Sequence, residues 1–365
     1  MDEQGIIALL GRRDEPTDAV EEYCRYLGAA LGAHGFELAV TRLPWTERGW
    51  SAALRELGQK AANWHGRWVC LQYTALAWSA RGFPLRFLSV LGVLRGAGAR
   101  VAVVYHDAGP YSGSRGLDKL RRAVQLHVMR GSLRHANLGI FTVPLSAISW
   151  FGAPPRNAAF IPVGANLPVA VVNETKACKS PQHVLRVAVF GITGGEAGRK
   201  ESGRIAEAVR FVSTTIGKLE LRAFGRHAAD CESTLRESLR DAPVDVQVQG
   251  VLPPEEVVRE LESADVMLFV RGAISTRRGS AIAGIACGLP VVAERGAETT
   301  GPIEEAGVVL VSREKPGEFR EALLRVLTNA AYRAQLAERS RLARDKYFSW
   351  PAIAARYAEE LRKTR

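Results

Sequence analysis

Short apolar runs rich in β-branched residues alternate with helix-like patterns along the whole chain. The intervals between these runs leave room for a crossover helix, since a strand-helix-strand unit needs roughly 30 residues. Alternation of this kind predicts an α/β fold built on parallel sheets. The predicted strands are residues 5–10, 37–43, 68–72, 100–105, 138–143 and 159–162 in the first half, and residues 185–191, 219–225, 244–248, 266–270, 290–293 and 308–311 in the second.

The two series of strands are separated by residues 169–184, a stretch with little hydrophobic periodicity that we interpret as an interdomain linker. The chain is therefore expected to form two domains, residues 1–168 and residues 185–350. In open parallel sheets, ligands bind beyond the carboxyl ends of the strands. The loops that follow the strands are where we expect the chemistry.

The tail from residue 316 to 365 is predicted to be wholly helical with one interruption, at residues 348–351. Proline is well placed in the first turn of a helix. A final helix is therefore expected to start near Pro351, with Ser349 or Trp350 as its cap.

The composition is that of an ordinary globular protein: of the 365 residues, 47% are hydrophobic and 24% charged, which excludes intrinsic disorder and a fibrous architecture. The formal net charge is +11, with +8 in residues 1–183 and +3 in residues 184–365. Such a balance favours an anionic partner, whether nucleic acid, membrane surface, phosphorylated substrate or nucleotide. A positive net charge is compatible with each of these partners and does not distinguish between them.

Five scattered cysteines, an odd number without any C-x-x-C pair, argue against a disulfide framework and a structural zinc site. We find no metal-ligand cluster and expect no metal or other cofactor. The first residues lack a basic segment followed by an apolar one, so a cytoplasmic location is expected. The longest charge-free run, residues 135–155, contains a histidine, an asparagine and three prolines, which breaks the pattern of a membrane span.

Residues 250–293 form the most informative segment. A strand ends near Val270, a loop carries three arginines, and a short helix begins at Gly279 and Ser280 and ends at Gly288, where a left-handed cap is expected. A helix N-terminus with unpaired amides, a nearby glycine and arginines is typical of a diphosphate site. The plainer alternative is a loop whose arginines are solvated. The arginines are Arg271, Arg277 and Arg278.

This segment resembles the donor-binding half of glycosyltransferase family 4, a group of enzymes with the GT-B fold. Residues 286–293, Ala-Cys-Gly-Leu-Pro-Val-Val-Ala, match the end of the family's Glu-x7-Glu helix, and residues 250–252 resemble its turn before the nucleotide base. The two glutamates of the family fall on Ser275 and Ala283, so both carboxylates are missing. Ser275 retains a hydroxyl that can bond to a sugar, whereas Ala283 has no polar side-chain atom.

The resemblance implies an α/β GT-B fold, with two Rossmann-like domains facing across a cleft and the last helix, residues 351–365, packing back on the first domain. It also implies a retaining, metal-independent transfer of a sugar, a hexose by expectation, from a nucleotide diphosphate sugar to an acceptor hydroxyl, in polysaccharide or glycolipid assembly. The donor-binding residues that it implies are Arg199, Lys200, Arg226, Leu252, Arg271, Ser275, Arg277, Arg278, Gly279 and Ser280.

In the first domain, the loop after the first strand carries Gly11, Arg12 and Thr17, followed by Asp18 and Glu21 at the spacing of a capping box. The resemblance makes this loop part of the acceptor side. It also gives the strand-end pair His106 and Asp107 a catalytic role, with His106 as a hydrogen-bond donor to the sugar or the reacting centre. A lone histidine at a strand end is otherwise more often structural.

The basic stretch 115–135 is predicted to be a surface helix whose apolar face, from Leu117 and Leu120 to Val124 and Val128, packs on the domain. A peripheral contact with the inner face of an anionic membrane is the sharper alternative, because many family 4 enzymes act on lipid-linked acceptors. Because both family glutamates are missing, a non-catalytic nucleotide- or sugar-binding protein is a second hypothesis. Nucleic-acid binding is disfavoured, since cations and aromatics are not interleaved.

Overall fold

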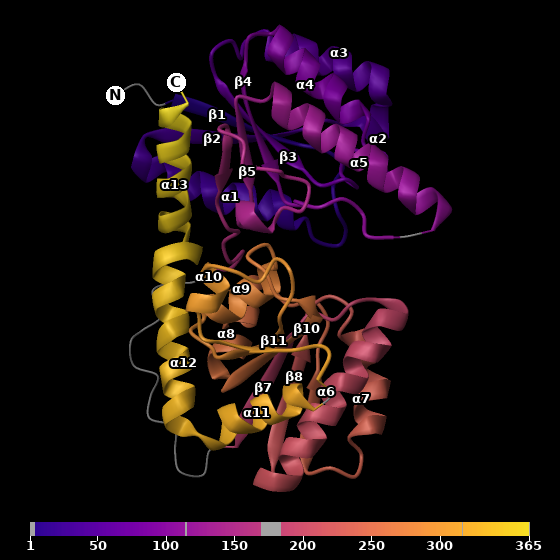
Figure 1. Ribbon diagram of the computed structural model, residues 1–365, viewed down its shortest axis with the longest axis vertical. Helices are drawn as coiled ribbons and strands as arrows, with labels where there is room; N and C mark the ends of the chain where they lie inside the picture. The colour runs from indigo at the N-terminus through magenta and orange to yellow at the C-terminus, as the bar shows by residue number, and fades with distance from the viewer. Residues whose placement is uncertain (1–3, 114, 169–183, 316, 365) are drawn as a thin grey trace. The chain divides into compact units, whose positions relative to one another are not determined.

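The computed structural model describes residues 4–113, 115–168, 184–315 and 317–364. The chain divides into two compact units, Met1–Val163 with Trp350–Arg365 (unit 1) and Gly164–Ser349 (unit 2). Each unit holds one six-stranded parallel sheet covered by helices on both faces (Figure 1). The expected linker, residues 169–184, lies outside the described residues except for its last position.

The sheet of unit 1 has the strand order β2-β1-β3-β4-β5-β6, and every neighbouring pair is parallel. Strands β3 and β5 are buried along their whole length, which explains why they appear in the sequence as continuous apolar runs. The strands are β1 (Gln4–Leu10), β2 (Phe36–Arg42), β3 (Trp68–Tyr73), β4 (Arg100–Tyr105), β5 (Leu138–Phe141) and β6 (Ala158–Phe160).

Three helices, α3, α4 and α5, cover one face of this sheet, where they enclose a core with alternate residues of β1, β3 and β4 (Figure 1). On the other face α1 lies against β1 and β2, with the C-terminal helix α13 packed beside it. The helices are α1 (Ala19–Leu31), α2 (Trp45–Arg48), α3 (Trp50–Ala61), α4 (Arg86–Gly96), α5 (Gly116–His135) and α13 (Trp350–Lys363), with short 3₁₀ turns η1 (Gly32–His34) and η2 (Leu145–Ala147).

The sheet of unit 2 has the order β12-β11-β10-β7-β8-β9, again with all neighbours parallel. Its strands are β7 (Leu185–Phe190), β8 (Leu219–Phe224), β9 (Val244–Val248), β10 (Val266–Ala273), β11 (Val291–Glu294) and β12 (Val308–Val311). Helices α6 (Gly195–Ile216), α7 (Glu232–Ser238) and α11 (Glu318–Thr328) share one core with the sheet. The remaining helical segments are α8 (Pro254–Ser263), α9 (Gly279–Ala286), α10 (Pro302–Glu305), α12 (Ala330–Ala343), the 3₁₀ turn η3 (Ala229–Cys231) and the π-helical turn η4 (Arg344–Phe348).

All twelve predicted strands are present, with ends that differ from the prediction by at most a few residues. The helix α9 starts at Gly279 and is followed by Gly288 with φ of 69°, as the glycine pattern predicts. The α/β fold with two parallel sheets is therefore confirmed.

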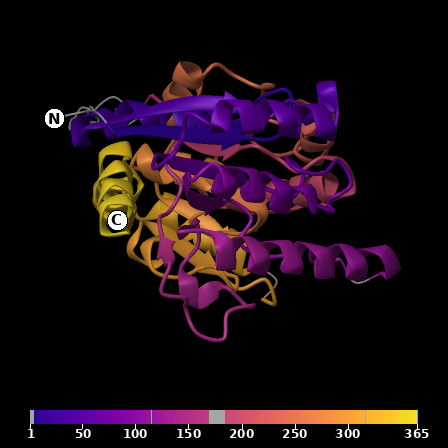
Figure 2. The same ribbon diagram turned by 90° about the horizontal axis from the view of Figure 1, so that it is seen from above.

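Two expectations about helices are wrong. Leu117 and Leu120 are 71% and 55% exposed, because the first turns of α5 extend beyond the sheet and only its later turns reach the core (Figure 2). The C-terminal tail is also interrupted a second time, at Asn329, whose side chain accepts from the amide of Tyr332 and so caps a new helix, α12.

The strand orders fix where each sheet changes winding direction. In unit 1 the chain moves from β1 to β2 on one side and returns to β3 on the other, so the switch lies between β1 and β3. In unit 2 the chain runs outward from β7 to β9 and returns to β10, so the switch lies between β7 and β10. Ligand sites of doubly wound sheets form beyond the carboxyl ends of the strands at such switch points.

Candidate functional site

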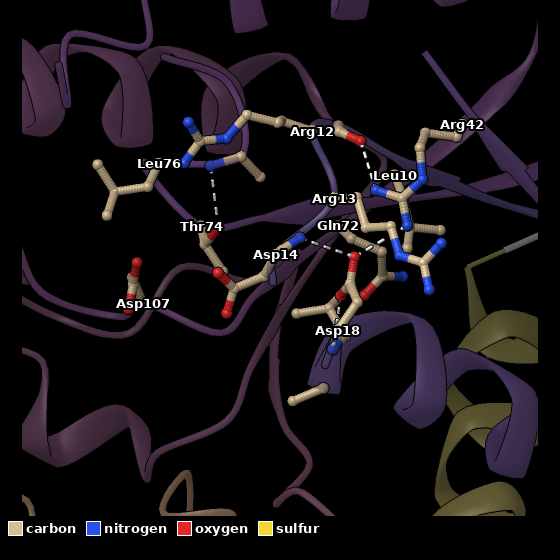
Figure 3. A pocket seen from close by; sticks show the side chains of 14 residues that line it. Leu10, Arg12, Arg13, Asp14, Asp18, Arg42, Gln72, Thr74, Leu76 and Asp107 are labelled. Atoms are coloured by element: carbon tan, nitrogen blue, oxygen red, sulfur yellow. Dashed lines mark hydrogen bonds and ion pairs between the residues drawn. The ribbon is translucent and has the colours of Figure 1, made fainter. Parts of the chain in front are cut away.

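A cavity of about 260 Å³ opens at the switch point of unit 1. It is lined by the loop after β1, by the end of β3 and by the residue after His106 (Figure 3). It brings together three residues of the sequence-predicted sites, Gly11, Arg12 and Asp107. In the view of Figure 3, Leu76 and Arg12 lie toward one end, Arg13 and Arg42 toward the other, and Asp14 between them. The lining therefore mixes cations with carboxylates, which suits a ligand that carries both hydroxyl and anionic groups.

The loop after β1 is held in place by Arg42 at the end of β2. Its guanidinium donates to the carbonyl oxygen of Gly11 at 2.7 Å and to carboxylates of Asp18 and Glu21 at 2.9 and 2.8 Å. Asp18 in turn accepts from the amides of Val20 and Glu21, both at 3.1 Å, and so caps α1 as predicted. The carboxylate of Glu21 pairs with arginines. The first amides of α1 donate to the carboxylate of Asp18 and are therefore not open to a ligand.

His106 directly follows β4, and its imidazole Nε2 lies 2.8 Å from the side-chain oxygen of Gln72 on β3. The ring is partly buried and packs edge-on against Tyr23 of α1, with 5.1 Å between the ring centroids. Burial lowers the pKa of His106 to about 4, although Asp18 acts to raise it, so the ring is neutral at pH 7. Asp107 accepts a hydrogen bond from the amide of Ala75 at 3.3 Å.

At the switch point of unit 2, β7 leads into a glycine-rich loop and then into the long helix α6. Gly191 and Gly195 have φ of 79° and 69°, conformations that favour glycine. The loop folds back on the first turns of α6: the amide of Thr193 donates to Glu201 at 2.7 Å, and a Cβ on Gly198 would lie 1.9 Å from the carbonyl oxygen of Thr193. Within the described residues, no side chain caps the N-terminus of α6.

Two arginines flank this loop, Arg271 on strand β10 and Arg226 in the loop that follows strand β8. Arg271 reaches the backbone of Gly191, where an added Cβ would lie 3.4 Å from a guanidinium nitrogen. Burial lowers the pKa of Arg271, Glu201 acts to raise it, and the positive charge of Arg226 lowers it further. The Nε of Arg271 is buried and makes no hydrogen bond within the described residues. The two positive charges of Arg271 and Arg226, with the single carboxylate of Glu201 nearby, leave a net positive charge that attracts anions.

The loop between β10 and α9 carries the other predicted donor contacts. Ser275 is 1% exposed, and its hydroxyl has no hydrogen-bond partner among the described residues. Arg277 forms a two-point ion pair with Glu298, at 2.8 and 3.3 Å. Arg278 is half-buried and directly precedes α9, whose N-terminus has no side-chain cap. The orphaned Ser275 hydroxyl marks this loop as a place where a bound group could supply the missing hydrogen bond.

No described contact joins the remaining predicted residues to Arg226 or Arg271. Arg199 and Lys200 lie on the exposed surface of α6, and Lys200 pairs with Glu196 at 2.8 Å. Gly279 and Ser280 form the first turn of α9, Leu252 follows β9 in a half-buried position, and Thr17 is a half-buried residue of the β1 loop.

Four residues that the sequence did not single out take part in these sites, namely Arg42, Gln72, Glu201 and Glu298. Arg42 is the last residue of β2, at the carboxyl edge of its sheet, a position that could have drawn attention to it. The described residues contain no group of three or more histidine, cysteine or carboxylate side chains that could hold a metal ion. Four of the cysteines, Cys24, Cys70, Cys231 and Cys287, are buried and free.

Neither a protein-family model nor a curated protein matches the sequence. Solved structures do match along almost the whole chain. Sucrose-phosphate synthase from Thermosynechococcus elongatus has a TM-score of 0.68 at 19% identity, covering 99% of this chain and 98% of that one. HepE of Anabaena, solved in complex with UDP and glucose, has a TM-score of 0.64 at 14% identity, covering 99% of this chain and 100% of that one.

A third structure, a putative UDP-N-acetylglucosamine 2-epimerase from Listeria monocytogenes, has a TM-score of 0.61 at 12% identity and covers 99% of this chain and 96% of that one. Structural matches at identities this low show the fold alone. The reaction has to be argued from the residues of the site. Two doubly wound parallel sheets, matched end to end by these structures, show that the chain has the GT-B fold.

Proposed function

We propose that this protein is a glycosyltransferase that moves a sugar from a nucleotide diphosphate sugar to an acceptor hydroxyl. The observation that carries the proposal is the pair Arg226 and Arg271, which flank the glycine-rich loop after β7 at the switch point of unit 2. Sugar transfer from such a donor releases a diphosphate, and its developing charge needs fixed cations and amides. The fold match to HepE, which was solved with UDP and glucose, supports the same ligand class.

The donor would be held by complementary parts of unit 2. Arg271 and Arg226 would grip the diphosphate through charge-assisted hydrogen bonds, with the uncapped N-termini of α6 and α9 as further anion-stabilising groups. The free hydroxyl of Ser275 would bond to a hydroxyl of the sugar or ribose. Arg277 would act through Glu298, whose carboxylate it orients.

The acceptor would enter the cavity of unit 1. His106 and Asp107 at the end of β4 would position the reacting sugar, while Arg12 and Arg13 would attract an acceptor that carries a negative group. The net charge of +8 in residues 1–183 agrees with an anionic acceptor. Retention of anomeric configuration, independence from metal ions, a hexose donor and a role in polysaccharide or glycolipid assembly remain parts of the proposal that rest on the family 4 resemblance.

A thermal-shift screen of nucleoside diphosphates and nucleotide sugars tests the donor assignment. A ligand that binds only the native state raises the melting temperature. At a concentration 100 times its Kd, it adds about 2.7 kcal/mol to the free energy of unfolding. We expect stabilisation by one nucleoside diphosphate and by its sugar conjugate. Product analysis then separates the possible activities. Release of the nucleoside diphosphate together with a glycosylated product supports transfer. Binding with no chemical change supports the non-catalytic alternative, which the replacement of both family glutamates by Ser275 and Ala283 favours.

The projecting end of α5 supports a peripheral contact with the cytoplasmic face of an anionic membrane. Leu117 and Leu120 are exposed there next to Lys119 and Arg122, and Leu85 at the start of the neighbouring helix α4 is 51% exposed. Exposed leucines among cations are typical of a surface that binds at the lipid interface. No described helix is long and apolar enough to cross a bilayer.

Co-sedimentation with vesicles tests this contact. We expect binding to phosphatidylglycerol-containing vesicles, weak binding to pure phosphatidylcholine, and loss of binding in the double variant Leu117→Ser with Leu120→Ser. The matched control is Leu342→Ser, since Leu342 is 59% exposed on α12 of unit 2. Equal sedimentation of the double variant and the wild type would contradict the membrane role of α5.

A further inference from the structure

Gln72 is a buried polar side chain that the proposed reaction has not yet used. It lies on β3, is 2% exposed, and lines the cavity of unit 1 (Figure 3). Its amide group makes two hydrogen-bond contacts: the side-chain nitrogen donates to the carbonyl oxygen of Cys70 at 3.2 Å, and the side-chain oxygen lies 2.8 Å from Nε2 of His106. A buried polar group with both ends occupied has a fixed orientation.

The carbonyl oxygen of Cys70 decides which end of the amide faces His106. A backbone carbonyl only accepts hydrogen bonds, so the side-chain nitrogen of Gln72 must point toward it and the oxygen must point toward the imidazole. The reversed amide would place two acceptor oxygens against each other. Because the oxygen of Gln72 only accepts, Nε2 of His106 must carry the proton of their 2.8 Å hydrogen bond.

We infer that Gln72 is a positioning residue that holds His106 in one tautomer, with the proton on Nε2. Nδ1, which makes no hydrogen bond within the described residues, then remains an acceptor that a hydroxyl of the bound sugar can approach. This role differs from the donor role that the family resemblance implies for His106. The inference deepens the proposed function, on which its ligand rests. The tautomer itself follows from the protein geometry alone.

Burial keeps the imidazole of His106 neutral. Tyr23 of α1 packs edge-on, and its hydroxyl donates to Tyr357 of α13 at 2.8 Å, so it is turned to another partner. The charged group that acts on the ring is the carboxylate of Asp18, and it opposes the effect of burial. The neighbouring strand β3 supplies Tyr73, and Asp107 follows in the chain. With a pKa of about 4, the ring reaches its charged form only well below neutral pH.

An acceptor nitrogen selects its ligand by chemistry. A hydroxyl can donate to Nδ1, whereas a carboxylate, a phosphate oxygen or a ring ether at the same place would present a second acceptor and be repelled. The site is therefore built for a sugar with a free hydroxyl at this point, in preference to its uronic acid or deoxy analogue. Losing one such hydrogen bond is expected to weaken binding or turnover about tenfold.

Nitrogen-15 correlation spectra of the histidine-labelled full chain test the tautomer without any ligand. We expect His106, assigned from the signals lost in His106→Gln, to show the Nε2-protonated pattern at pH 7. In Gln72→Met the partner oxygen is absent, so His106 should shift toward a mixture of tautomers. The matched control is Gln125→Met, since Gln125 is likewise buried in unit 1 but bonds to Gly82 and Tyr111, and it should leave the His106 signals unchanged.

Gln72→Glu provides a readout that a merely structural role would not move. A carboxylate at this position loses the hydrogen bond to the carbonyl oxygen of Cys70, but it still accepts from Nε2 and also stabilises the imidazolium, so the titration midpoint of His106 should rise by at least one pH unit. With the donor found by the stability screen, the acid limb of the kcat/KM profile should rise with it. An Nδ1-protonated His106 in the wild type, or a tautomer unchanged in Gln72→Met, would overturn the inference. Failure of the proposed function would instead appear as absent nucleotide binding with these spectra intact.

Discussion

Arg271→Met is the substitution that separates a diphosphate-binding arginine from a structural one. Arg271 lies beside Gly191 at the end of β10, its Nε is buried without a hydrogen-bond partner among the described residues, and it shares its surroundings with the like charge of Arg226. Methionine keeps much of the apolar stem and removes the guanidinium. The fold of unit 2 should therefore persist while the anion contact is lost.

The expected loss of binding free energy follows from the charge and burial of the Arg271 guanidinium. A hydrogen bond between a charged donor and a charged acceptor contributes about 1.5–3 kcal/mol to stability or binding. Arg271 is already partly desolvated and repelled by Arg226, so little of the gain from binding an anion is lost to dehydration. We expect a loss of about 2–3 kcal/mol, which raises the Kd for the nucleoside diphosphate about 30- to 150-fold.

Isothermal titration with UDP, or with the diphosphate that the stability screen selects, measures this difference. The matched control is Arg236→Met on α7, because Arg236 is 53% exposed and, among the described residues, pairs with Glu232 in the preceding turn. Its Kd should stay within about twofold of the wild type, since exposed pairs of this kind contribute little. Equal diphosphate affinity of Arg271→Met and the wild type would refute the assignment of the site.

Three further predictions concern stability. The unfolded chain takes up a proton near pH 6.5 that buried His106 binds only at about pH 4, so stability should fall as the pH drops through this interval, by up to about 3 kcal/mol, and His106→Gln should remove that part of the fall in thermal melts. Gly198→Ala should cost about 1–3 kcal/mol and weaken diphosphate binding, because the new Cβ meets a backbone carbonyl of the β7 loop, whereas Gly203→Ala, in open space on the same helix, should be neutral or stabilising in the same melts. Tyr357→Phe should lower the urea-unfolding free energy by about 1–2 kcal/mol, because the buried hydroxyl of Tyr23 loses its acceptor.

The strands were predictable because each one is a local apolar pattern. Strand β4 was expected at residues 100–105 and β12 at 308–311, and both were found at those bounds. Parallel strands covered on both faces must be apolar along their length, so the sequence shows them directly. The start of α9 at Gly279 was predictable for a similar reason, since glycine and proline mark the ends of that short helix.

The exposure of Leu117 and Leu120 could not be predicted, because helical periodicity says which residues share a face but not where the sheet beneath that face ends. The placement of Arg199 and Lys200 depended likewise on a tertiary detail. The helix α6 begins at Gly195, so both residues lie on its exposed surface. Long-range geometry, absent from any local pattern, determines these positions.

Gln72 is the clearest case of a site residue that the sequence conceals. It stands in a six-residue strand that is buried throughout, next to no recognisable motif. Only the parallel register, which sets Gln72 opposite Val104 and so two residues from His106, brings the amide and the imidazole together. The topology of the sheet thus determines the chemistry of the histidine that the sequence did single out.

Whether this protein is a glycosyltransferase is decided by measuring sugar transfer from the donor that stabilises it. The purified protein is incubated with that nucleotide sugar and a membrane lipid extract as the source of acceptors, and nucleoside diphosphate release and glycosylated product are measured together. We expect stoichiometric release and product with the wild type and with Arg236→Met, and a large loss of both with Arg271→Met. A nucleotide sugar that binds tightly and is recovered unchanged, or converted to an epimer without diphosphate release, would contradict this expectation.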